Sequence, residues 1–514
     1  MGDPAVRSSR FLSDTAILVY LAVTTWLLHM VFATHYGIFR DELYYIACSK
    51  HLAWGYVDEP PFAPLLLFLV RHTLGESLYA IRFLPAVCNS LVVLLSGLMA
   101  RELGAGRFGQ ALAGLAVMVG GVFLGVGHFY SMSCFDHLFW ALAVYVLIRL
   151  LKEDRPRLWL LFGLIAGVGL MNKYSMGFLG IGLIVGLLLT PARRYFRSRW
   201  LWIGGALASL MFLPHVLWEY HHGFPTAEFI HNATFHKNLP MSPPQFMMEV
   251  ALELLPLTIP LWLAGIYFYF FSREGKPYRV LGWIFLAFLA ILLSTNAKPY
   301  YFVPAFPMLF AGGAVLFEAA ARRPGWGWSK PGYAALLALG GIFFLPYAVP
   351  VLPVDTFIKY ENFVGIHPSS GERDRPTELP QVYADQFGWE NQVAVVAKVY
   401  NSLTPEERAR TLIYCSNYGQ AGAIDFFGKK YGLPNASSGH NNYWFWGPQN
   451  PNADMVITIG EGREDVQKSF NDVQLAATVI SPYARSFETN LPIYIGRGLK
   501  MPLKEIWPHT KDFI

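Results

Sequence analysis

Cysteine and charged residues are both scarce in this chain of 514 residues. The four cysteines, Cys48, Cys88, Cys134 and Cys415, are far apart and include no CxxC pair, which argues against a disulfide framework and a cysteine-based zinc site. Charged residues make up only 15% of the chain, against about a quarter in ordinary soluble proteins. This composition excludes a disordered chain, a collagen-like fibre and a typical cytosolic enzyme.

Hydrophobic residues are abundant instead, at 54% of the chain, and the mean hydropathy is +0.35. Charge is divided unevenly along the sequence. Residues 1–353 hold 25 Lys and Arg against 17 Asp and Glu, a net charge of +8, whereas residues 354–514 hold 15 against 18, a net charge of −3. We therefore predict a membrane domain over residues 1–353 and a soluble domain over residues 354–514.

Transmembrane helices are expected throughout the first domain, because a helix needs about 20 apolar residues to cross a bilayer core. Eleven segments are read as spans: 14–34, 78–101, 109–127, 133–151, 157–172, 174–190, 200–219, 247–271, 279–296, 299–320 and 332–353. The first outer loop, residues 35–77, contains an apolar but short and proline-broken stretch at 59–72. We expect interfacial helices in this loop.

The positive charges predict the orientation in the membrane. Counting from Arg7 and Arg10, 18 of the 25 Lys and Arg residues of the first domain fall in the segments that would share the side of the N-terminus. Cytoplasmic segments carry such an excess, so we expect a cytoplasmic N-terminus. An odd number of spans then places residues 354–514 on the outer side of the membrane.

Ionisable residues in the membrane domain cluster at the expected outer ends of the spans. They are Asp136, Lys173, His215, Glu219, Glu249, Glu253 and Lys298, with Tyr300 and Tyr301 beside the last. Each alone could be a snorkelling or interfacial residue, but such groups are expensive in a membrane and these share one side. A polar cavity that opens at the outer surface accounts for them best. Asp41-Glu42, directly after the first span, fits either a helix N-terminus or catalysis.

The C-terminal domain shows an α/β pattern. Apolar β-rich runs at 411–414 and 455–459 alternate with helical runs at 392–402, 405–410 and 463–471. The segment 418–422 follows a strand and precedes a helix, but it lacks the full GxGxxG fingerprint, so no nucleotide cofactor is expected. Histidines 221, 222, 231 and 236 share one outer loop without the spacing of a metal motif, and no metal ligand is assigned.

Five segments carry a resemblance to a known family. They are RDELYYIACSKHLAWGYVDEPP at 40–61, SMSCFDHLFWALAVYVLI at 131–148, GVGLMNKYSMGFL at 167–179, AKPYYFVPAFPML at 297–309 and SNYGQAGAIDFFGKKYGLPNASSGHNNYWFWGP at 416–448. In these segments the chain resembles the bacterial dolichyl-phosphate-mannose-protein mannosyltransferase-like family. These membrane glycosyltransferases of the GT-C superfamily include the aminoarabinose transferase of lipid A modification. The resemblance implies a GT-C type helical membrane domain with a periplasmic α/β domain.

The resemblance also implies a donor of the form polyprenyl-phosphate-sugar, such as an undecaprenyl phosphate derivative, and transfer at the outer face. Asp41 matches the family's first acidic position, with Glu42 as its companion, and Asp136 matches the second. Residues expected to bind the lipid phosphate or the sugar are Lys173, Lys298, Tyr301, Arg82, His51, Glu59 and Tyr45. Glu59 is a departure, since relatives often have His or Lys before the double proline; a divalent metal could neutralise this position.

The chemistry itself requires two kinds of group. A carboxylate can accept the proton of the incoming hydroxyl, and Asp41 is the expected base of an inverting hexosyl or pentosyl transfer. Cationic side chains or a metal stabilise the leaving phosphate. The acceptor can be a lipid, a glycan or a protein; a monomer is expected, and no nucleic-acid partner.

The alternative from another class is a transporter or flippase of a lipid-linked sugar with an extracytoplasmic binding domain. A transporter sequence is expected to contain internal repeats and polar groups near the midplane of the membrane. The sequence shows no repeat, and its polar groups gather at one surface, so we favour the transferase.

Overall fold

The computed structural model describes residues 13–368, 371–373, 375 and 377–514, so Arg7 and Arg10 lie outside the described residues. The chain divides into two compact units. The helical unit comprises Met1–Ala33, Glu76–Val216 and Pro240–Val351, and the mixed unit comprises Thr34–Gly75, Leu217–Leu239 and Leu352–Ile514. The mixed unit thus joins the first outer loop to the C-terminal segment, a grouping that the sequence-based division at residue 353 does not include.

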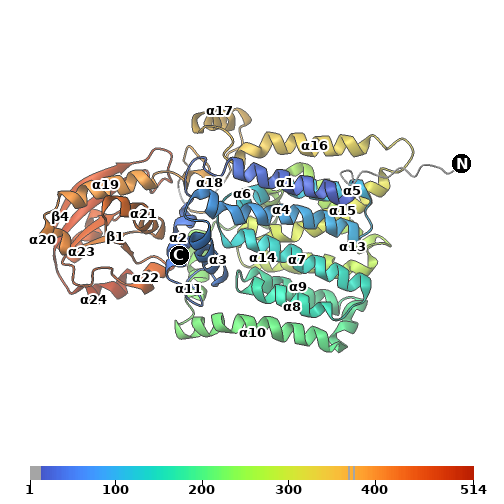
Figure 1. Cartoon of the computed structure of the whole chain (residues 1–514), viewed down its shortest axis with the longest axis horizontal. Helices are drawn as coiled ribbons and strands as arrows, with labels where there is room; N and C mark the ends of the chain where they lie inside the picture. The colour runs from blue at the N-terminus through green and yellow to red at the C-terminus, as the bar shows by residue number, and fades with distance from the viewer. Residues whose placement is uncertain (1–12, 369–370, 374, 376) are drawn as a thin grey trace. The chain divides into compact units, whose positions relative to one another are not determined.

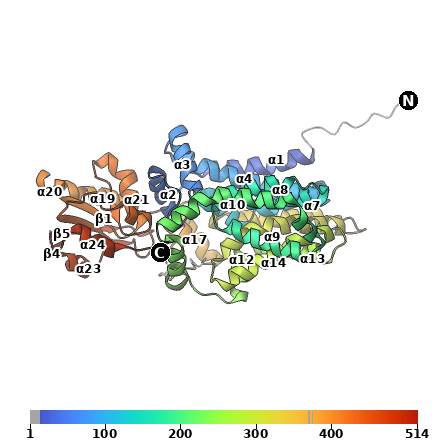
Figure 2. The ribbon, with the colours of Figure 1, turned by 90° about the horizontal axis from the view of Figure 1, so that it is seen from below.

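The helical unit is a bundle whose helices run side by side (Figures 1 and 2). Its α-helices are α1 Asp14–Val31, α4 Leu78–Glu102, α5 Arg107–Met118, α6 Gly121–His128, α7 Met132–Glu153, α8 Leu158–Leu170, α9 Ser175–Leu188, α10 Arg199–His221, α12 Pro243–Glu253, α13 Ile259–Phe271, α14 Arg279–Ser294, α15 Phe306–Ala320 and α16 Ser329–Phe344. The core between them is apolar and large, with Trp140, Phe268 and Phe302 fully buried.

Every segment read as a span is largely helical, but two of them are bent. The segment expected at 109–127 forms α5 and α6 with a 60° bend, and the one at 247–271 forms α12 and α13 with a 99° bend. The second break falls at Leu255, whose φ is +76°, followed by Pro256. A proline lacks the backbone N–H and disfavours helical geometry in the preceding residue, so a straight helix cannot continue there.

The chain is a multi-pass membrane protein. Among the described residues, six helices are long and apolar enough to cross a membrane, and up to nine spans result if each bent pair counts as one. The helical membrane fold is therefore confirmed, while the number of eleven spans stays a prediction. Helix α8 is apolar but has only 13 residues, so it is too short to be counted among the six.

Small residues set the distance between α8 and α10. A Cβ atom added at Gly163 would meet the backbone of Gly204, and one added at Gly204 would meet the backbone carbonyl of Trp159. Helices in membranes use such small residues to bring their backbones together, because lipid offers no hydrophobic driving force for association. Gly205, the next residue of α10, has open space at its Cβ position.

The mixed unit contains the remaining elements. Its first part holds α2 Arg40–Lys50, α3 Phe62–Thr73 and α11 Pro225–Asn232. Its C-terminal part holds α17 Val354–Val364, α18 Gln381–Ala384, α19 Trp389–Ser402, α20 Pro405–Ala409, β1 Thr411–Cys415, α21 Tyr418–Phe427, β2 Ser437–Ser438, α22 Asn442–Trp446, β3 Met455–Ile459, α23 Arg463–Ser469, β4 Phe470–Ile480, β5 Asn490–Leu499 and α24 Leu503–Ile506. The expected helices of the first loop and the expected α/β domain are both present.

One sheet with strand order β2-β1-β3-β5-β4 organises the C-terminal part. β1 runs parallel to β2 and β3, whereas β5 runs antiparallel to β3 and β4. All five residues of β3 are buried, as expected for the centre of a sheet. Helices α19 and α21 lie on one side of this sheet (Figure 2). The long β4–β5 pair at residues 470–499 is absent from the sequence-based reading, which extends a helix to residue 471.

The α8–α10 contact generates a paired prediction. Gly204→Ala adds a methyl group against the Trp159 carbonyl and should lower the stability of the protein by about 1–3 kcal/mol relative to Gly205→Ala. Both changes raise helix propensity equally, so their difference isolates the clash. Thermal unfolding in detergent micelles measures it. Equal unfolding temperatures for the two variants would show that the close approach is wrong.

Candidate active site

Helix α2 begins with the charged sequence Arg40-Asp41-Glu42. The Glu42 carboxylate accepts a hydrogen bond of 2.8 Å from the backbone N–H of Phe39, the residue before the helix, and its side chain is fully buried. Acidic side chains in a first turn are also stabilised by the helix dipole. Glu42 therefore has a structural role as a cap, and its predicted catalytic role stays a prediction. Asp41 is half-buried, with its carboxylate outside the cap.

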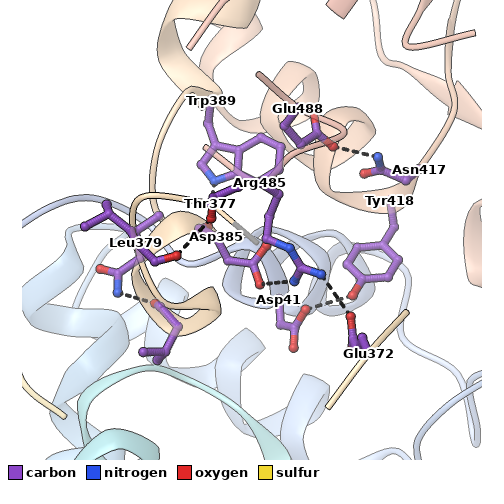
Figure 3. Close-up of polar contacts among 12 residues, drawn as sticks. Asp41, Glu372, Thr377, Leu379, Asp385, Trp389, Asn417, Tyr418, Arg485 and Glu488 are labelled. Atoms are coloured by element: carbon purple, nitrogen blue, oxygen red, sulfur yellow. Dashed lines mark hydrogen bonds and ion pairs between the residues drawn. The ribbon is translucent and has the colours of Figure 1, made fainter. Parts of the chain in front are cut away.

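Asp41 receives a hydrogen bond from a residue of the C-terminal part. The Tyr418 hydroxyl donates to Oδ1 of Asp41 at 2.8 Å (Figure 3). The guanidinium of Arg40 lies 4.6 Å from the centre of the Tyr418 ring, in cation–π geometry. Asp41 thus has one oxygen held by a tyrosine hydroxyl, with a guanidinium near that tyrosine, an arrangement suited to a carboxylate that must keep one orientation.

A second acidic pair, Asp58 and Glu59, follows in the same loop. Asp58 accepts a hydrogen bond of 2.9 Å from the Tyr44 hydroxyl, and burial raises its pKa to about 6. Glu59 is buried, and burial together with the charges of Asp58 and Asp41 raises its pKa well above the ordinary value, although a hydrogen bond from Tyr45 opposes the shift. Burial thus favours the neutral form of Glu59. The departure from His or Lys therefore places a carboxyl group with a raised pKa at this position.

A network of buried charges lies next to the start of α2. Arg485 pairs with Glu372 at 3.0 Å and with Asp385 at 3.2 Å, and all three side chains are almost completely buried (Figure 3). The backbone carbonyl of Asp385 accepts a hydrogen bond of 2.9 Å from the backbone N–H of Arg40. Removing one partner of such a buried network leaves an uncompensated charge, so this group fixes where α2 begins.

His440 lies on the other side of Tyr418. Its Nδ1 accepts a hydrogen bond of 3.3 Å from the Tyr418 backbone N–H, and its Nε2 donates one of 2.8 Å to the Ile514 carbonyl. Burial, aided by the charges of Arg40 and Lys237, lowers the pKa of His440 to about 3. The imidazole is therefore neutral, in the tautomer that carries its proton on Nε2.

The helical unit holds a separate polar group at the N-terminal turn of α7. Asp136 is buried and accepts a hydrogen bond from the Ser175 hydroxyl. Lys173, in the turn between α8 and α9, donates to the Ser133 hydroxyl at 3.0 Å and lies 4.7 Å from the centre of the Tyr301 ring. The structure thus brings together three predicted site residues: Asp136, Lys173 and Tyr301.

The remaining predicted residues have other surroundings. Arg82 is buried and donates a hydrogen bond of 2.8 Å to the Ala33 carbonyl. Lys298 interacts electrostatically with Glu253. The His51 ring stacks on the Trp446 ring, with 4.4 Å between the ring centres. Asp41 belongs to the mixed unit and Asp136 to the helical unit, so their expected convergence in one cavity stays a prediction. The roles of all these residues stay predictions as well.

The described residues include no group of three or more His, Cys, Asp or Glu side chains that could hold a metal ion. His222 stacks on Trp218 at 4.2 Å, and His231 lies 4.7 Å from the Phe235 ring. These histidines therefore have aromatic neighbours rather than a ligand set. A divalent metal stays a prediction, and no step of the chemistry below is routed through one.

Sequence reasoning missed two residues that the structure places beside Asp41. Arg40 precedes it directly, and the run of three charged residues Arg40-Asp41-Glu42 was the available signal that this helix start needs partners. Tyr418 lies in the segment 418–422, between the predicted strand and the predicted helix, but its contact with the first loop spans 377 residues of sequence. A contact at that separation leaves no local pattern.

Comparison with known families confirms the resemblance. The family model described as dolichyl-phosphate-mannose-protein mannosyltransferase matches residues 58–218. The lipid A galacturonosyltransferase RgtD of Rhizobium johnstonii is 25% identical over 293 residues, which cover 56% of this chain and 61% of the relative. The lipopolysaccharide core galacturonosyltransferase RgtB of the same organism is 29% identical over 196 residues, which cover 36% of this chain and 38% of the relative. The chain therefore matches less than two thirds of the length of these curated relatives.

Solved structures share the fold. ArnT from Cupriavidus metallidurans in the apo state matches with a TM-score of 0.61 at 14% identity, covering 94% of this chain and 98% of the other. The same protein bound to undecaprenyl phosphate gives a TM-score of 0.58 at 14% identity, with coverages of 93% and 97%. The archaeal oligosaccharyltransferase AglB from Archaeoglobus fulgidus gives 0.52 at 14% identity, with coverages of 88% and 70%. The chain has a GT-C type fold.

The neutral state of His440 predicts a pH dependence of stability. Between its folded pKa of about 3 and the ordinary value of 6.5, the unfolded chain binds a proton that the folded chain does not. This histidine therefore makes stability fall as the pH drops below 6.5, by at most about 1.4 kcal/mol per pH unit. In His440→Asn, whose side-chain oxygen can replace Nδ1 as acceptor, this part of the pH dependence should disappear.

Thermal unfolding of the full chain at several pH values between about 4 and 6.5 checks the prediction. The raised pKa values of Asp58 and Glu59 act in the opposite direction but equally in both proteins. Parallel stability curves for the parent and His440→Asn would mean that His440 is not held neutral.

Proposed function

We propose that this chain is a membrane glycosyltransferase that moves a sugar from a polyprenyl-phosphate-linked donor to an acceptor hydroxyl at the outer face of the bacterial inner membrane. The GT-C fold, shared over nearly the whole chain with a structure that binds undecaprenyl phosphate, supports a donor of this kind. The names of the two curated relatives support lipopolysaccharide as the acceptor and a uronic acid as the first sugar to test.

The observation that carries the proposal is the setting of Asp41. Its carboxylate is half-buried at the start of α2, and a neutral tyrosine hydroxyl holds one oxygen at 2.8 Å. The second oxygen can accept the proton of an acceptor hydroxyl. A carboxylate with one oxygen held and the other available fits proton transfer from a reacting hydroxyl, and this supports the transferase over the flippase alternative.

The proposed reaction is a single displacement at the anomeric carbon. The acceptor oxygen attacks this carbon while Asp41 takes the hydroxyl proton, and the bond between the anomeric carbon and the phosphate oxygen breaks. The products are the inverted glycoside and polyprenyl phosphate, and the proton on Asp41 passes later to water. No covalent bond to the protein forms.

We propose that Lys173 stabilises the negative charge on the leaving phosphate. Its ammonium group is already placed by the Ser133 hydroxyl and the Tyr301 ring, so little reorganisation is needed when charge develops. Asp136, which accepts a hydrogen bond from Ser175 beside Lys173, is a candidate for orienting the Lys173 ammonium group. Further candidates for contact with the substrate are Arg82, Lys298, His51, Glu59, Tyr45 and Glu42.

Asp41→Asn should lower the rate of sugar transfer by about 10²–10⁴-fold, because the amide keeps the shape of the side chain but cannot take the proton. The assay follows sugar transfer from a panel of polyprenyl-phosphate donors, galacturonosyl first, to lipopolysaccharide by the purified full chain. Asp355→Asn is the matched control, since Asp355 also accepts from a tyrosine hydroxyl, Tyr483, at 2.9 Å but at an exposed position.

Equal transfer by the parent and Asp41→Asn would remove Asp41 as the base. Loss of transfer in Asp355→Asn to the same extent would show that the assay reports folding rather than chemistry. If the folded parent transfers no sugar on a broad donor panel but moves a lipid-linked sugar across vesicles, the flippase alternative is correct.

Lys173→Gln should reduce kcat/KM for the donor by about 10- to 100-fold, the loss expected for one charge-assisted hydrogen bond to phosphate. KM for the acceptor should stay unchanged. Lys152→Gln is the control, because Lys152 forms an exposed ion pair with Glu102 at 3.0 Å in the same unit. An unchanged donor kcat/KM in Lys173→Gln would contradict the assignment.

A further inference from the structure

The tyrosine that contacts Asp41 comes from the C-terminal part of the mixed unit. Tyr418 is the first residue of α21, and Asp41 is the second residue of α2. Two glycines allow these helices to touch: a Cβ added at Gly422 would lie 2.9 Å from the Cβ of Leu43, and one added at Gly419 would lie 2.8 Å from the Cγ of Arg40. The glycine spacing of α21 therefore brings the Tyr418 hydroxyl within reach of Asp41.

Tyr418 has little freedom to move. Its ring lies 4.7 Å from the ring of Tyr44 and 4.7 Å from that of His440, and only 8% of the residue is exposed. The start of its helix is fixed as well, because the Asn417 side chain accepts hydrogen bonds from the backbone N–H groups of Gly419 and Gln420. The hydroxyl position is thus set by packing before any substrate binds.

The cap residue is itself anchored. The amide group of Asn417 donates a hydrogen bond of 2.8 Å to the buried carboxylate of Glu488, which also accepts from the Gln420 amide at 3.1 Å (Figure 3). A side chain held by its own packing and by such supporting hydrogen bonds can keep a reacting group in one geometry. A chain of contacts therefore leads from Glu488, just before β5, through Asn417 and the start of α21 to Tyr418 and the carboxylate of Asp41.

We propose that Tyr418 is a positioning residue of the transfer reaction, supplied by the C-terminal domain, whose hydroxyl holds one oxygen of Asp41 so that the other faces the acceptor. The proposal rests on the proposed function, in which Asp41 is the base. It makes the C-terminal domain part of the catalytic apparatus rather than an accessory to it.

Tyr418→Phe removes only the hydroxyl and tests the proposal in the full-length protein. We expect kcat to fall about 10- to 100-fold, as for the loss of one hydrogen bond to a charged group, with KM for the donor unchanged. Tyr443→Phe is the matched control: Tyr443 is equally buried in the same domain, and its hydroxyl donates to Asp425 at 2.9 Å. The control should keep the parental kcat.

A double-mutant cycle separates positioning from a general structural effect. In an Asp41→Asn background there is no base to orient, so adding Tyr418→Phe should cause no further loss of the residual transfer. The same fold-loss in both backgrounds would overturn the proposal, as would a parental kcat in Tyr418→Phe. Where residual transfer falls below detection, the separation of kcat from KM and the Tyr443→Phe control decide.

The experiments distinguish failure of the base role of Asp41 from failure of the positioning role of Tyr418. An inactive Asp41→Asn beside a fully active Tyr418→Phe would leave the proposed function intact and reject only the positioning role. Full activity in Asp41→Asn would reject the base, and with it the role of Tyr418. A drop in unfolding temperature of Tyr418→Phe that Tyr443→Phe matches, with kcat preserved in both, would assign the hydroxyl to stability alone.

Discussion

The cost of burying charge is the constraint on which the mixed unit depends. Helix α2 is buried over most of its length and yet begins with Arg40-Asp41-Glu42. A buried charge without a partner is strongly destabilising, so each of these side chains needs a compensating group. Glu42 caps its own helix, Arg40 lies over the Tyr418 ring, and Asp41 accepts the Tyr418 hydroxyl. The backbone and side chain of Asp385 connect this helix start to Arg485.

This arrangement explains why the first outer loop and the C-terminal segment form one compact unit. Three charges of the loop have partners beyond residue 370: Arg40 and Asp41 contact Tyr418, and Lys50 donates to the Asp425 carbonyl. The glycines of α21 allow this helix and α2 to approach closely. A carboxylate that is kept in place by such a network is preorganised, so the reaction requires less rearrangement of the protein than a flexible loop would. The same network makes the C-terminal domain necessary for the geometry of Asp41.

Much of the fold follows from the sequence alone. Apolar length predicted the helical segments of the membrane domain, and β-rich runs predicted β1 and β3 to within one residue. The bends at Leu255-Pro256 and near Gly120 were not predicted, because a window of apolar residues averages over a local break. The β4–β5 pair was missed because β4 is largely exposed and lacks a regular alternation of apolar and polar residues, and its start reads as the end of α23.

The candidate site was predicted as a set of residue types and not as a set of contacts. Lys173, Tyr301 and Asp136 all lie at the ends of neighbouring helices that the sequence places on one side of the membrane, so the sequence could indicate that they lie close together. The Asp41–Tyr418 hydrogen bond could not be indicated, since it depends on how the C-terminal part folds against the loop. The burial of Glu59, which raises its pKa, is likewise a tertiary feature that the sequence does not indicate.

A structure of the full-length protein with an intact polyprenyl-phosphate-sugar analogue and an acceptor bound tests the central claim most directly. The account predicts that the free oxygen of Asp41 lies within hydrogen-bond reach, about 2.6–3.2 Å, of the acceptor hydroxyl, with the Tyr418 hydroxyl still on the other oxygen. A bound sugar whose anomeric carbon and acceptor both lie beyond the reach of Asp41 would contradict it.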